Sequence, residues 1–384
     1  MSIENFTNEK ITIYSHYETT GACEELRDWL KAKKARKVVY VAFPFLRSRN
    51  KYIRVDQIEN GEIKSSQRSV IRFKKPEAVS YAKDLIYGVI YGIRYAGQSA
   101  LFVGGDNLLS LIGIVLKHLG LVRRVAYYMI DYTPVRFPNR LLNAAYQCID
   151  RIAAYGVDYV WPLTRRMIEA RFENGRLDPA KVNWFEVPYG SHTVDIGRGR
   201  PINRTNIAYM GGISKNKGAE LFVPIAKELK SRTIEFKFTI IGDGEYMSTL
   251  KSQISQARLI DNFQILGFVE NFNEAVRTLS SCGLAIAPYY PFDKNSFTCY
   301  ADPGKLKVYL GCGLPIVLTD MPPIARLIEE RGAGVTARYD AADFAAQIIK
   351  IITSPEYEQF RKNASKLGSQ YEWDTIFREA FSKL

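Results

Sequence analysis

The chain has 384 residues, of which 47% are hydrophobic and 24% charged, and it carries a formal net charge of +13. This length and composition are typical of a globular protein with room for two domains, and they exclude a disordered chain. The apolar runs fall short of the roughly 18 residues of a transmembrane candidate, and the first residues lack the pattern of a secretory signal. Five cysteines without a C-x-x-C pair and three histidines predict neither a disulfide framework nor a metal site, and they fit a reducing cytoplasm.

The positive charge is concentrated in the first half of the chain. Residues 1–200 contain 31 lysines and arginines against 20 aspartates and glutamates, whereas residues 201–384 contain 22 against 20. We therefore expect the first half to meet an anionic partner, for which nucleic acid, an anionic membrane surface and a phosphate-bearing substrate are the candidates.

The chain opens with a pattern typical of a doubly wound α/β sheet. Residues 11–14 predict a strand, residues 22–35 a helix and residues 38–43 the next strand. Ligands of such sheets bind at the carboxyl ends of strands, so the loop at 15–21 is a candidate binding loop or a plain connector. Three of its residues are acceptor-side candidates: His16, Thr20 and Gly21.

A basic and aromatic region follows. Residues 44–75 interleave lysine and arginine with aromatic residues, and the alternation at 69–73 predicts a strand or a hairpin. Residues 77–96 predict a helix rich in tyrosine. Such amphipathic aromatic faces suit a membrane interface, and they suit equally a core helix with one solvated side.

Two strands of the first half end in an aspartate. The strand at 100–103 leads to Asp106 ahead of a helix at 108–119, and the strand at 124–130 leads to Asp131. A carboxylate at the carboxyl end of a strand faces the crevice of the sheet, where it can handle a proton or a hydroxyl; the alternative is a turn cap. Further helices and strands complete the domain: helices at 139–154 and 164–173, and strands at 159–162 and 184–188.

The second half repeats the pattern after an aperiodic segment at 191–205. Its predicted strands end at residues 210, 241, 266 and 288, and three of them run into loops rich in glycine. The loop at 211–218 carries Lys217, which is placed to pair with a phosphate that the glycines allow to approach closely.

The stretch from 300 to 320 organises the second half. Asp302 and Pro303 form a loop, residues 305–310 a short helix that glycines close, and residues 314–318 a buried strand. A loop that enters a helix N-terminus is a prepared anion site, and Lys305 and Lys307 add positive charge to its first turn. An ordinary αβ unit with surface lysines is the alternative.

The loops of the second half, in their order, resemble those of a known enzyme family. The matching segments are Gly211-Gly212…Lys217-Gly218, Ile240-Ile241-Gly242-Asp243-Gly244, Leu266-Gly267-Phe268-Val269, and Asp302-Pro303…Gly313-Leu314-Pro315-Ile316-Val317. In the first half, residues 131–150, 157–167 and 187–191 are similar to N-terminal domains of bacterial sugar transferases. The chain thus resembles GT-B glycosyltransferases, in particular retaining glycosyltransferase family 4 and the sugar transferases of polysaccharide and glycoconjugate assembly.

The resemblance implies an α/β fold of GT-B type, with two Rossmann-like domains that face each other across a cleft. It places an acceptor-binding domain at 1–195, a linker at 196–205 and a domain for the nucleotide sugar at 206–365. Residues 366–384 are expected to form a C-terminal helix that crosses back onto the first domain.

The resemblance also implies roles for single residues. Lys217 and Lys305 would neutralise the departing diphosphate, and Asp131 completes the catalytic candidates. The donor-binding candidates are Gly211, Gly212, Gly242, Asp243, Gly244, Phe268, Val269, Asp302 and Pro303. Asp106 joins the acceptor side.

Several positions depart from the family pattern. The glutamates of its E-x7-E motif fall on Tyr300 and Val308, so Asp302 is our substitute for ribose recognition. A common arginine is Gly212 here, and a histidine frequent on the first domain aligns near Ile130. Without a D-x-D carboxylate pair we expect metal-independent transfer and no cofactor besides the donor substrate.

The leading hypothesis is a retaining hexosyltransferase that works at the cytoplasmic face of the cell membrane. It would move a sugar from a nucleotide diphosphate to a saccharide acceptor. The basic first half of the chain favours an acceptor that is linked to a lipid. A nucleotide-sugar epimerase of the same fold, an inactive relative and a non-catalytic basic binding protein are alternatives. A pyridoxal-dependent phosphorylase would need a much longer chain, and nucleic acid is not expected because no DNA- or RNA-binding module is recognisable.

Overall fold

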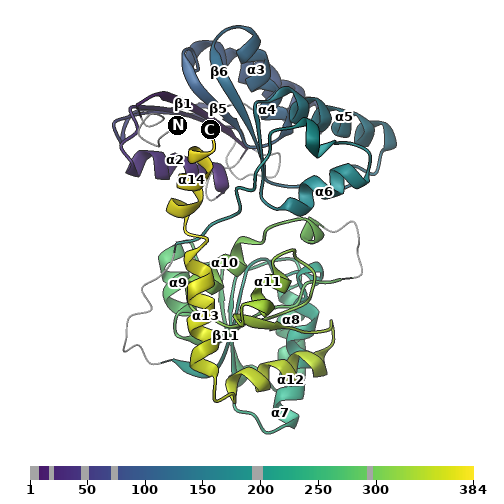
Figure 1. Ribbon diagram of the computed structural model, residues 1–384. Helices are drawn as coiled ribbons and strands as arrows, with labels where there is room; N and C mark the ends of the chain where they lie inside the picture. The colour runs from purple at the N-terminus through teal and green to yellow at the C-terminus, as the bar shows by residue number, and fades with distance from the viewer. Residues whose placement is uncertain (1–7, 17–20, 45–51, 71–76, 193–201, 292–296) are drawn as a thin grey trace. The chain divides into compact units, whose positions relative to one another are not determined.

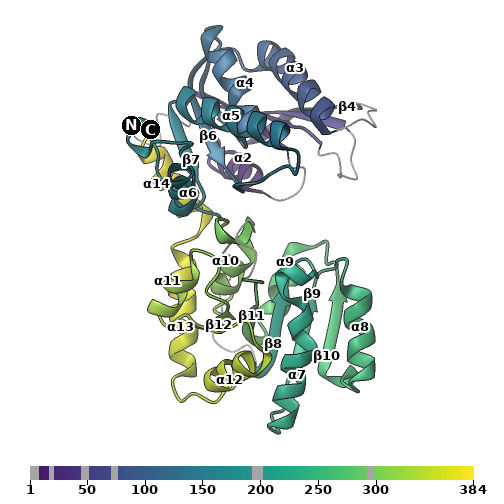
Figure 2. The ribbon, with the colours of Figure 1, turned by 90° about the vertical axis from the view of Figure 1, so that its right-hand side faces the viewer.

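The computed structural model describes residues 8–16, 21–44, 52–70, 77–192, 202–291 and 297–384. The chain divides into two compact units: Met1–Pro188 with Trp373–Leu384 form the first, and Tyr189–Glu372 form the second. The predicted linker at 196–205 lies largely outside the described residues. Each unit is built on its own sheet with helices on both faces, as Figures 1 and 2 show.

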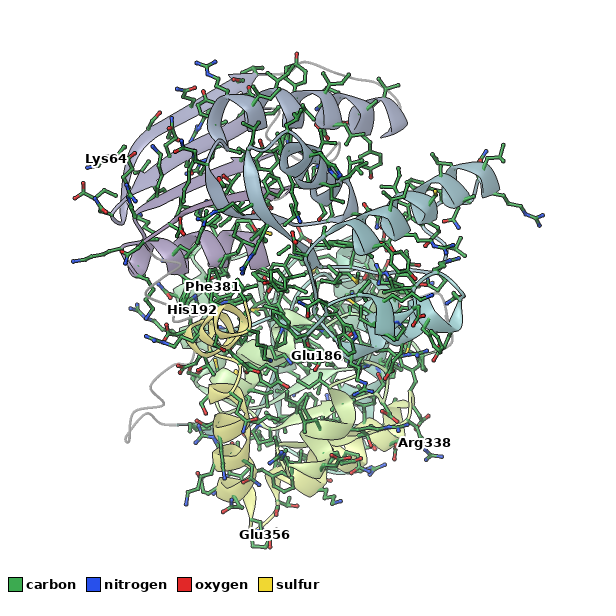
Figure 3. The ribbon with its side chains drawn as sticks, turned by 45° about the horizontal axis from the view of Figure 1, so that its top comes forward. Lys64, Glu186, His192, Arg338, Glu356 and Phe381 are labelled. Carbon is green, nitrogen blue, oxygen red and sulfur yellow. The ribbon has the colours of Figure 1, made fainter. Side chains whose placement is uncertain are left out.

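The sheet of the first unit has the strand order β4-β3-β2-β1-β5-β6-β7. Five of these strands pair in parallel, and an antiparallel hairpin extends the edge beyond β2. The strands are β1 (Lys10–Ser15), β2 (Lys37–Ala42), β3 (Tyr52–Glu59), β4 (Glu62–Val70), β5 (Ser99–Gly104), β6 (Val122–Met129) and β7 (Tyr159–Pro162). Lys64 on the outermost strand points away from the sheet in Figure 3. The strand or hairpin predicted at 69–73 overlaps the end of β4 at Ser69 and Val70, and residues 71–73 lie outside the described residues.

Helices cover both faces of this sheet because alternate strand residues point to opposite sides. Tyr14 on β1 donates its hydroxyl to Gly88 on one face, and Tyr40 on β2 donates to Glu24 on the other. The helices of this unit are α2 (Ala22–Ala32), α3 (Glu77–Tyr95), α4 (Asn107–His118), α5 (Arg140–Gly156), α6 (Arg165–Glu173), the 3-10 turn η1 (Pro179–Lys181) and α14 (Trp373–Ser382). Figure 1 shows α3, α4 and α5 together on one side and α2 with α14 on the other.

The last helix belongs to the first unit. The Trp29 ring of α2 lies 5.5 Å from the ring of Phe377 and 5.3 Å from that of Phe381. The indole also donates to Asp374 at 2.8 Å, and Lys33 pairs with the same carboxylate at 2.7 Å. The predicted return of the C-terminal helix to the first domain is confirmed.

The sheet of the second unit is parallel, with the strand order β10-β9-β8-β11-β12-β13. The strands are β8 (Asn203–Met210), β9 (Lys237–Ile241), β10 (Phe263–Gly267), β11 (Cys282–Ala287), β12 (Ile316–Leu318) and β13 (Gly334–Thr336). This order places β8 and β11 at the centre and brings their carboxyl ends together, which is where ligands of open α/β sheets bind.

Two hydrophobic cores lie against this sheet, one on each face. The first contains side chains of α7 (Phe222–Ser231), α8 (Met247–Gln256) and α12 (Ala341–Ile352). The second contains side chains of α9 (Phe272–Leu279), α10 (Gly304–Gly311), α11 (Ala325–Glu330) and α13 (Tyr357–Ser369). Short 3-10 turns complete the unit: η2 (Lys215–Lys217), η3 (Ala219–Leu221), η4 (Ile260–Asn262) and η5 (Phe297–Cys299).

Two elements differ from expectation. The segment predicted as a strand at 184–188 forms one parallel bridge, between Trp184 and Val160, and its amides at Phe185 and Val187 donate to β7 at 3.3 and 2.9 Å. It therefore pairs with the edge of the sheet over a shorter length than predicted. After the loop at 211–218 the chain first forms the 3-10 turn η3 and then enters α7 at Phe222. No helix of the described residues combines the length and apolar character needed to cross a membrane.

Candidate active site

Three glycine loops of the second unit interlock at the carboxyl ends of β8, β9 and β10. The Gly211 amide donates to Ile241 at 2.9 Å, and the Gly242 amide donates to Gly267 at 2.7 Å. Gly242 has φ +135, and a Cβ there would lie 2.0 Å from the Gly211 carbonyl oxygen. Only glycine fits at position 242, so the loops expected to hold the donor are fixed to one another by their backbones.

Two lysines meet beside these loops. The Lys305 ammonium, on the first turn of α10, lies 4.2 Å from the ring centroid of Tyr209 and 4.8 Å from that of Tyr289. The Lys217 ammonium lies 5.4 Å from the same Tyr289 ring. A Cβ built on Gly211 would be 3.7 Å from the Lys305 Nζ, so this lysine also borders the glycine loop.

The environment of both lysines disfavours their charge. Burial lowers the pKa of Lys305 well below its usual range, and the nearby charge of Lys217 lowers it further. Burial also lowers the pKa of Lys217. An anion bound between the two ammonium groups would offset both effects, so the cluster is suited to a phosphate or diphosphate.

The helix α10 is held in place by buried polar contacts. The Tyr309 hydroxyl accepts from the Met210 amide at 2.6 Å, which ties α10 to the end of β8. Lys307 pairs with Asp302 at 3.0 Å, and both side chains are buried. The other oxygen of Asp302 accepts from the Tyr189 amide at 2.8 Å. Lys307, expected to add surface charge, therefore supports the helix instead, and Asp302 already has two partners within the chain.

The remaining donor candidates surround this cluster. The Asp243 carboxylate accepts from the Gly244 amide at 2.8 Å, and its backbone carbonyl accepts from Ile213 at 3.0 Å. Phe268 follows Gly267 and is 75% exposed, which leaves its ring available for stacking, whereas Val269 packs against the core. Tyr300 and Val308, at the positions of the family glutamates, are both buried.

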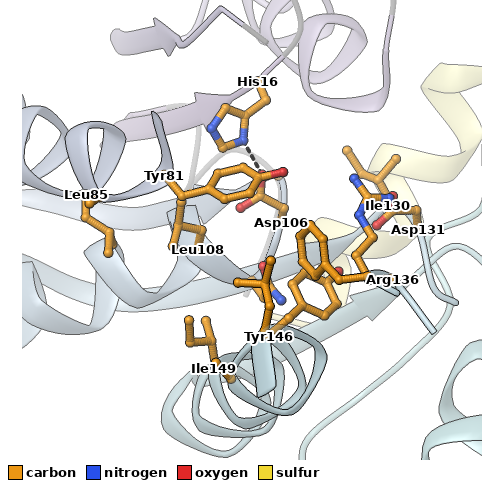
Figure 4. Close-up of a pocket in the computed structure, with 16 residues that line it drawn as sticks. His16, Tyr81, Leu85, Asp106, Leu108, Ile130, Asp131, Arg136, Tyr146 and Ile149 are labelled. Carbon is orange, nitrogen blue, oxygen red and sulfur yellow. Dashed lines mark hydrogen bonds and ion pairs between the residues drawn. The ribbon is translucent and has the colours of Figure 1, made fainter. Parts of the chain in front are cut away.

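The first unit contains a separate cavity of about 300 Å³ at the carboxyl ends of β1, β5 and β6. Figure 4 shows how α3 and α5 contribute the Tyr81 and Tyr146 rings to it. Most of its wall is apolar, and its polar residues lie at the strand ends: His16, Asp106, Asn107, Asp131 and Arg136. The cavity thus combines hydrophobic walls with a few convergent polar groups, as small-molecule sites do.

Asp131 is a partly buried carboxylate of this cavity. It pairs with Arg136 at 3.2 Å. Burial raises the pKa of Asp131 despite Arg136, and Asp106 adds to the rise. A carboxylate with a raised pKa accepts a proton more readily, which suits contact with a hydroxyl group. Arg171 helps to fix this loop, because its guanidinium lies 4.2 Å from the ring centroid of Tyr132, next to Asp131.

His16 joins three elements at the opposite wall. Its Nδ1 is hydrogen-bonded to Asp106, shown as a dashed line in Figure 4, and its Nε2 lies 3.4 Å from Asp84 on α3. Burial alone would lower the pKa of His16, but Asp106 and Asp84 outweigh burial and raise it to about 10. Asp106 also caps α4 by accepting from the Leu109 amide at 2.8 Å. Through these two aspartates the imidazolium therefore links the end of β1 to α3 and to the N-terminus of α4.

The candidates from the sequence thus gather in two places. His16, Asp106 and Asp131 line the cavity of the first unit, and Lys217, Lys305 and the glycines meet in the second. Gly21 lies at the start of α2, and Thr20 lies outside the described residues.

Sequence reasoning missed several residues of both places. They are Asp84, Arg136, Tyr209 and Tyr289. Three of them carried a positional signal: Arg136 lies five residues after Asp131, Tyr209 lies two residues before Gly211, and Tyr289 follows the strand β11. Asp84 lies on α3, distant in the sequence from the other residues of its cavity.

Comparison with known proteins defines the class of the fold. A structure of Anabaena Alr3699/HepE in complex with UDP superimposes with a TM-score of 0.65 at 16% identity, covering 98% of this chain and 100% of that one. Lipopolysaccharide outer core galactosyltransferase WaaB in its apo form gives 0.64 at 14% identity, covering 98% and 100%. At these identities the likeness establishes the GT-B fold.

A family match lies in the second unit. Residues 204–354 match the profile of the family described as Glycosyl transferases group 1. The resemblance to this group is confirmed over these residues, which are less than half of the chain.

Two characterised proteins align with parts of the chain. Alpha-D-kanosaminyltransferase of Streptomyces kanamyceticus is 28% identical over 171 residues, 43% of this chain and 41% of that protein. 2-deoxystreptamine N-acetyl-D-glucosaminyltransferase of Niallia circulans is 31% identical over 70 residues, 18% of each chain. The alignments span less than half of either relative.

Proposed function

We propose that the protein transfers a sugar, a hexose in the expected case, from a nucleotide diphosphate to a saccharide acceptor. The observation that carries the proposal is the pair of lysines beside the interlocked glycine loops. The chief task of such an enzyme is to stabilise the diphosphate that leaves, and two partly desolvated ammonium groups supply that stabilisation. A relative of the same fold is described in complex with UDP, which supports a uridine nucleotide as the first donor to test.

The proposed reaction assigns a role to each unit. In the second unit, Lys217 and Lys305 hold the diphosphate as the bond between the anomeric carbon and the phosphate oxygen breaks. In the first unit, the acceptor hydroxyl attacks the anomeric carbon on the face from which the diphosphate leaves, as retention requires, and its proton passes to Asp131. We expect retention of configuration and metal-independent transfer, as the resemblance implies.

The acceptor is proposed to be lipid-linked and the enzyme to work at the cytoplasmic face of the membrane, in polysaccharide or glycoconjugate assembly. Two features support this version. The first half of the chain carries the excess of basic residues, and the cavity of the first unit has predominantly apolar walls.

The test of the donor half is a thermal-shift and hydrolysis panel of UDP-, GDP-, TDP- and CMP-linked sugars. We expect one nucleotide class to stabilise the protein and Lys217→Ala to lose that response. Lys215→Ala is the matched control, because Lys215 is an exposed lysine of the same loop. A wild-type protein that responds to no donor, or a Lys217→Ala variant that responds as the control does, would contradict the proposal.

A further inference from the structure

Two helices that border the cavity of the first unit expose apolar stripes. On α3 the exposed residues recur at helical spacing, and Ile86 is 61% exposed. The α3 stripe consists of Val79, Ala82, Ile86, Ile90 and Ile93. On α5 the same spacing recurs, and Leu141 is 83% exposed. The α5 stripe consists of Leu141, Ala145, Cys148 and Ile152.

The two stripes share a face and are continuous with the cavity. Both helices pack on α4: Gly88 of α3 lies against Ile112, and Gly156 of α5 lies against Ile114. Figures 1 and 2 show the three helices on one side of the first sheet. Ala82 and Ala145 belong at once to the stripes and to the cavity wall. A hydrophobic molecule that lies on this face therefore has direct access to the cavity.

A basic cavity adjoins the α5 stripe. It has a volume of about 480 Å³ and contains three arginines, Arg140, Arg151 and Arg176. Cys148 lines this cavity and belongs to the α5 stripe as well, so it marks the border between the apolar and the basic surface. Arg140 and Arg151 form no ion pair with any carboxylate of the part of the chain that the structure describes.

Few acidic residues lie near Arg140 and Arg151 in the sequence. Between residues 78 and 157 the sequence has eight lysines and arginines and four acidic residues, all aspartates. Each aspartate is engaged within the fold: Asp84 with His16 and Lys83, Asp106 with His16, Asp131 with Arg136, and Asp150 with Arg171. The helix layer therefore presents apolar side chains and unopposed positive charge together.

We propose that α3 and α5 form a docking face for an anionic lipid bilayer, with the two stripes in the acyl boundary and the arginines on lipid phosphates. Apolar stripes flanked by arginine are the surface that interfacial helices present to such membranes. A lipid-linked acceptor would then enter the cavity from the bilayer between α3 and α5. The inference deepens the proposed function and rests on it only for the identity of the acceptor.

Cys148 provides a reporter of this docking. It is the one exposed cysteine of the five, all of which the structure describes. We would attach an environment-sensitive dye to Cys148 of the full chain and titrate vesicles of phosphatidylcholine, with and without one quarter phosphatidylglycerol. A Cys148→Ser variant gives the background labelling of the other thiols.

We expect a blue shift of the dye and flotation of the protein with the anionic vesicles. The double variant Ile86→Ser/Ile90→Ser should lose flotation, and Ile260→Ser, an equally exposed isoleucine of the second unit, should keep it. The double variant Arg140→Gln/Arg151→Gln should weaken binding to anionic vesicles roughly 25-fold, since each arginine near such a surface contributes roughly fivefold.

Three outcomes would overturn the inference. The first is that the wild type does not float with the vesicles, and the second is that Ile86→Ser/Ile90→Ser floats as well as Ile260→Ser does. The third is a stable dimer that the stripe variants dissociate, which would assign the face to a second copy of the chain. Donor hydrolysis in solution is measured on the same variants and should not change. In the wild type, flotation without donor hydrolysis would contradict the proposed function alone, and donor hydrolysis without flotation would contradict the docking face alone.

Discussion

Asp131 is the residue that we propose as the base for the acceptor hydroxyl. It lies in the first unit, and the donor candidates lie in the second. Changing Asp131 to Asn keeps its size and removes its basicity. We expect turnover to fall by about 100- to 10,000-fold, the usual contribution of a positioned base, with thermal stabilisation by the donor unchanged.

The pH profile gives a second readout of Asp131. Because burial raises its pKa, turnover should decline toward acid at a pH above the ordinary range of an aspartate, as the carboxylate becomes protonated. Asp261→Asn, at an exposed site, is the control. An Asp131→Asn enzyme with the wild-type rate would remove Asp131 from the mechanism.

His16 is predicted to stabilise the fold in a pH-dependent way. Its pKa is raised to about 10 in the folded state, compared with about 6.5 in an unfolded chain. Its contribution is therefore complete below about pH 6.5 and is lost progressively as the pH rises to about 10. His16→Gln should cost roughly 3–5 kcal/mol near pH 6, the usual cost of leaving a buried ion pair without one partner.

Chemical denaturation at pH 6, 8 and 10 checks this prediction. The difference between wild type and His16→Gln should shrink as the pH rises. His118→Gln, at an exposed histidine, should show no such trend. A difference that is constant over this pH range would assign the loss to packing and not to charge.

Single residues were predictable from the sequence where they follow a strand directly. Asp106, Asp131 and the glycines were found in this way, because parallel strands deliver their carboxyl ends to one edge. The role of Lys307 was not predictable, because its pairing with Asp302 depends on burial that charge alone does not reveal. Asp84 was missed for a related reason: 68 residues separate it from His16, and only tertiary packing brings the two together.

At the scale of elements, the loops after β8 and β9 are predicted to depend on Gly242. A Cβ at this position meets the Gly211 carbonyl oxygen, and φ +135 is strained for any other residue. Gly242→Ala should therefore cost about 1–3 kcal/mol of stability and weaken donor binding by displacing the loop at 211. Gly212→Ala is the control for stability, since a Cβ there has no neighbour within 4 Å.

Denaturation and a donor titration on both variants test this coupling. An alanine at 242 that is as stable as the alanine at 212, and that binds donor as the wild type does, would show that the two loops move independently.

Helices and strands were predicted best where the hydrophobic periodicity ends at the same residues as the glycines that break it. The short helix at 305–310 was found as Gly304–Gly311 and the tyrosine-rich helix at 77–96 as Glu77–Tyr95. The segment at 184–188 was found as one bridge with further backbone hydrogen bonds to β7, so it joins the sheet over a shorter length than predicted. Pairing partners decide whether an extended segment joins a sheet, and a single sequence does not contain that information.

For the whole molecule, the charge divides at the middle of the chain, whereas the first unit also includes residues from the C-terminal end. The basic excess lies in the first half of the chain, whereas the match to the glycosyltransferase profile covers residues 204–354. The first unit is also completed by residues from the far end of the chain. Its folding therefore depends on residues 373–384, and the second unit does not contain them.

Ending the chain after Glu372 is predicted to destabilise the first unit alone. The deletion removes the buried rings of Trp373, Phe377 and Phe381, and it uncovers Trp29 on α2. Loss of one buried aromatic ring costs roughly 3–5 kcal/mol, so three such losses approach the whole stability of a domain. The cores of the second unit contain no side chain from the deleted helix.

Calorimetry of the full and shortened chains should show one thermal transition lowered or lost and the other unchanged, with the surviving transition still raised by the donor nucleotide. Lys383→Ala, which leaves the aromatic rings in place, should behave as the wild type does. Equal shifts of both transitions would mean that the two units unfold as one cooperative body.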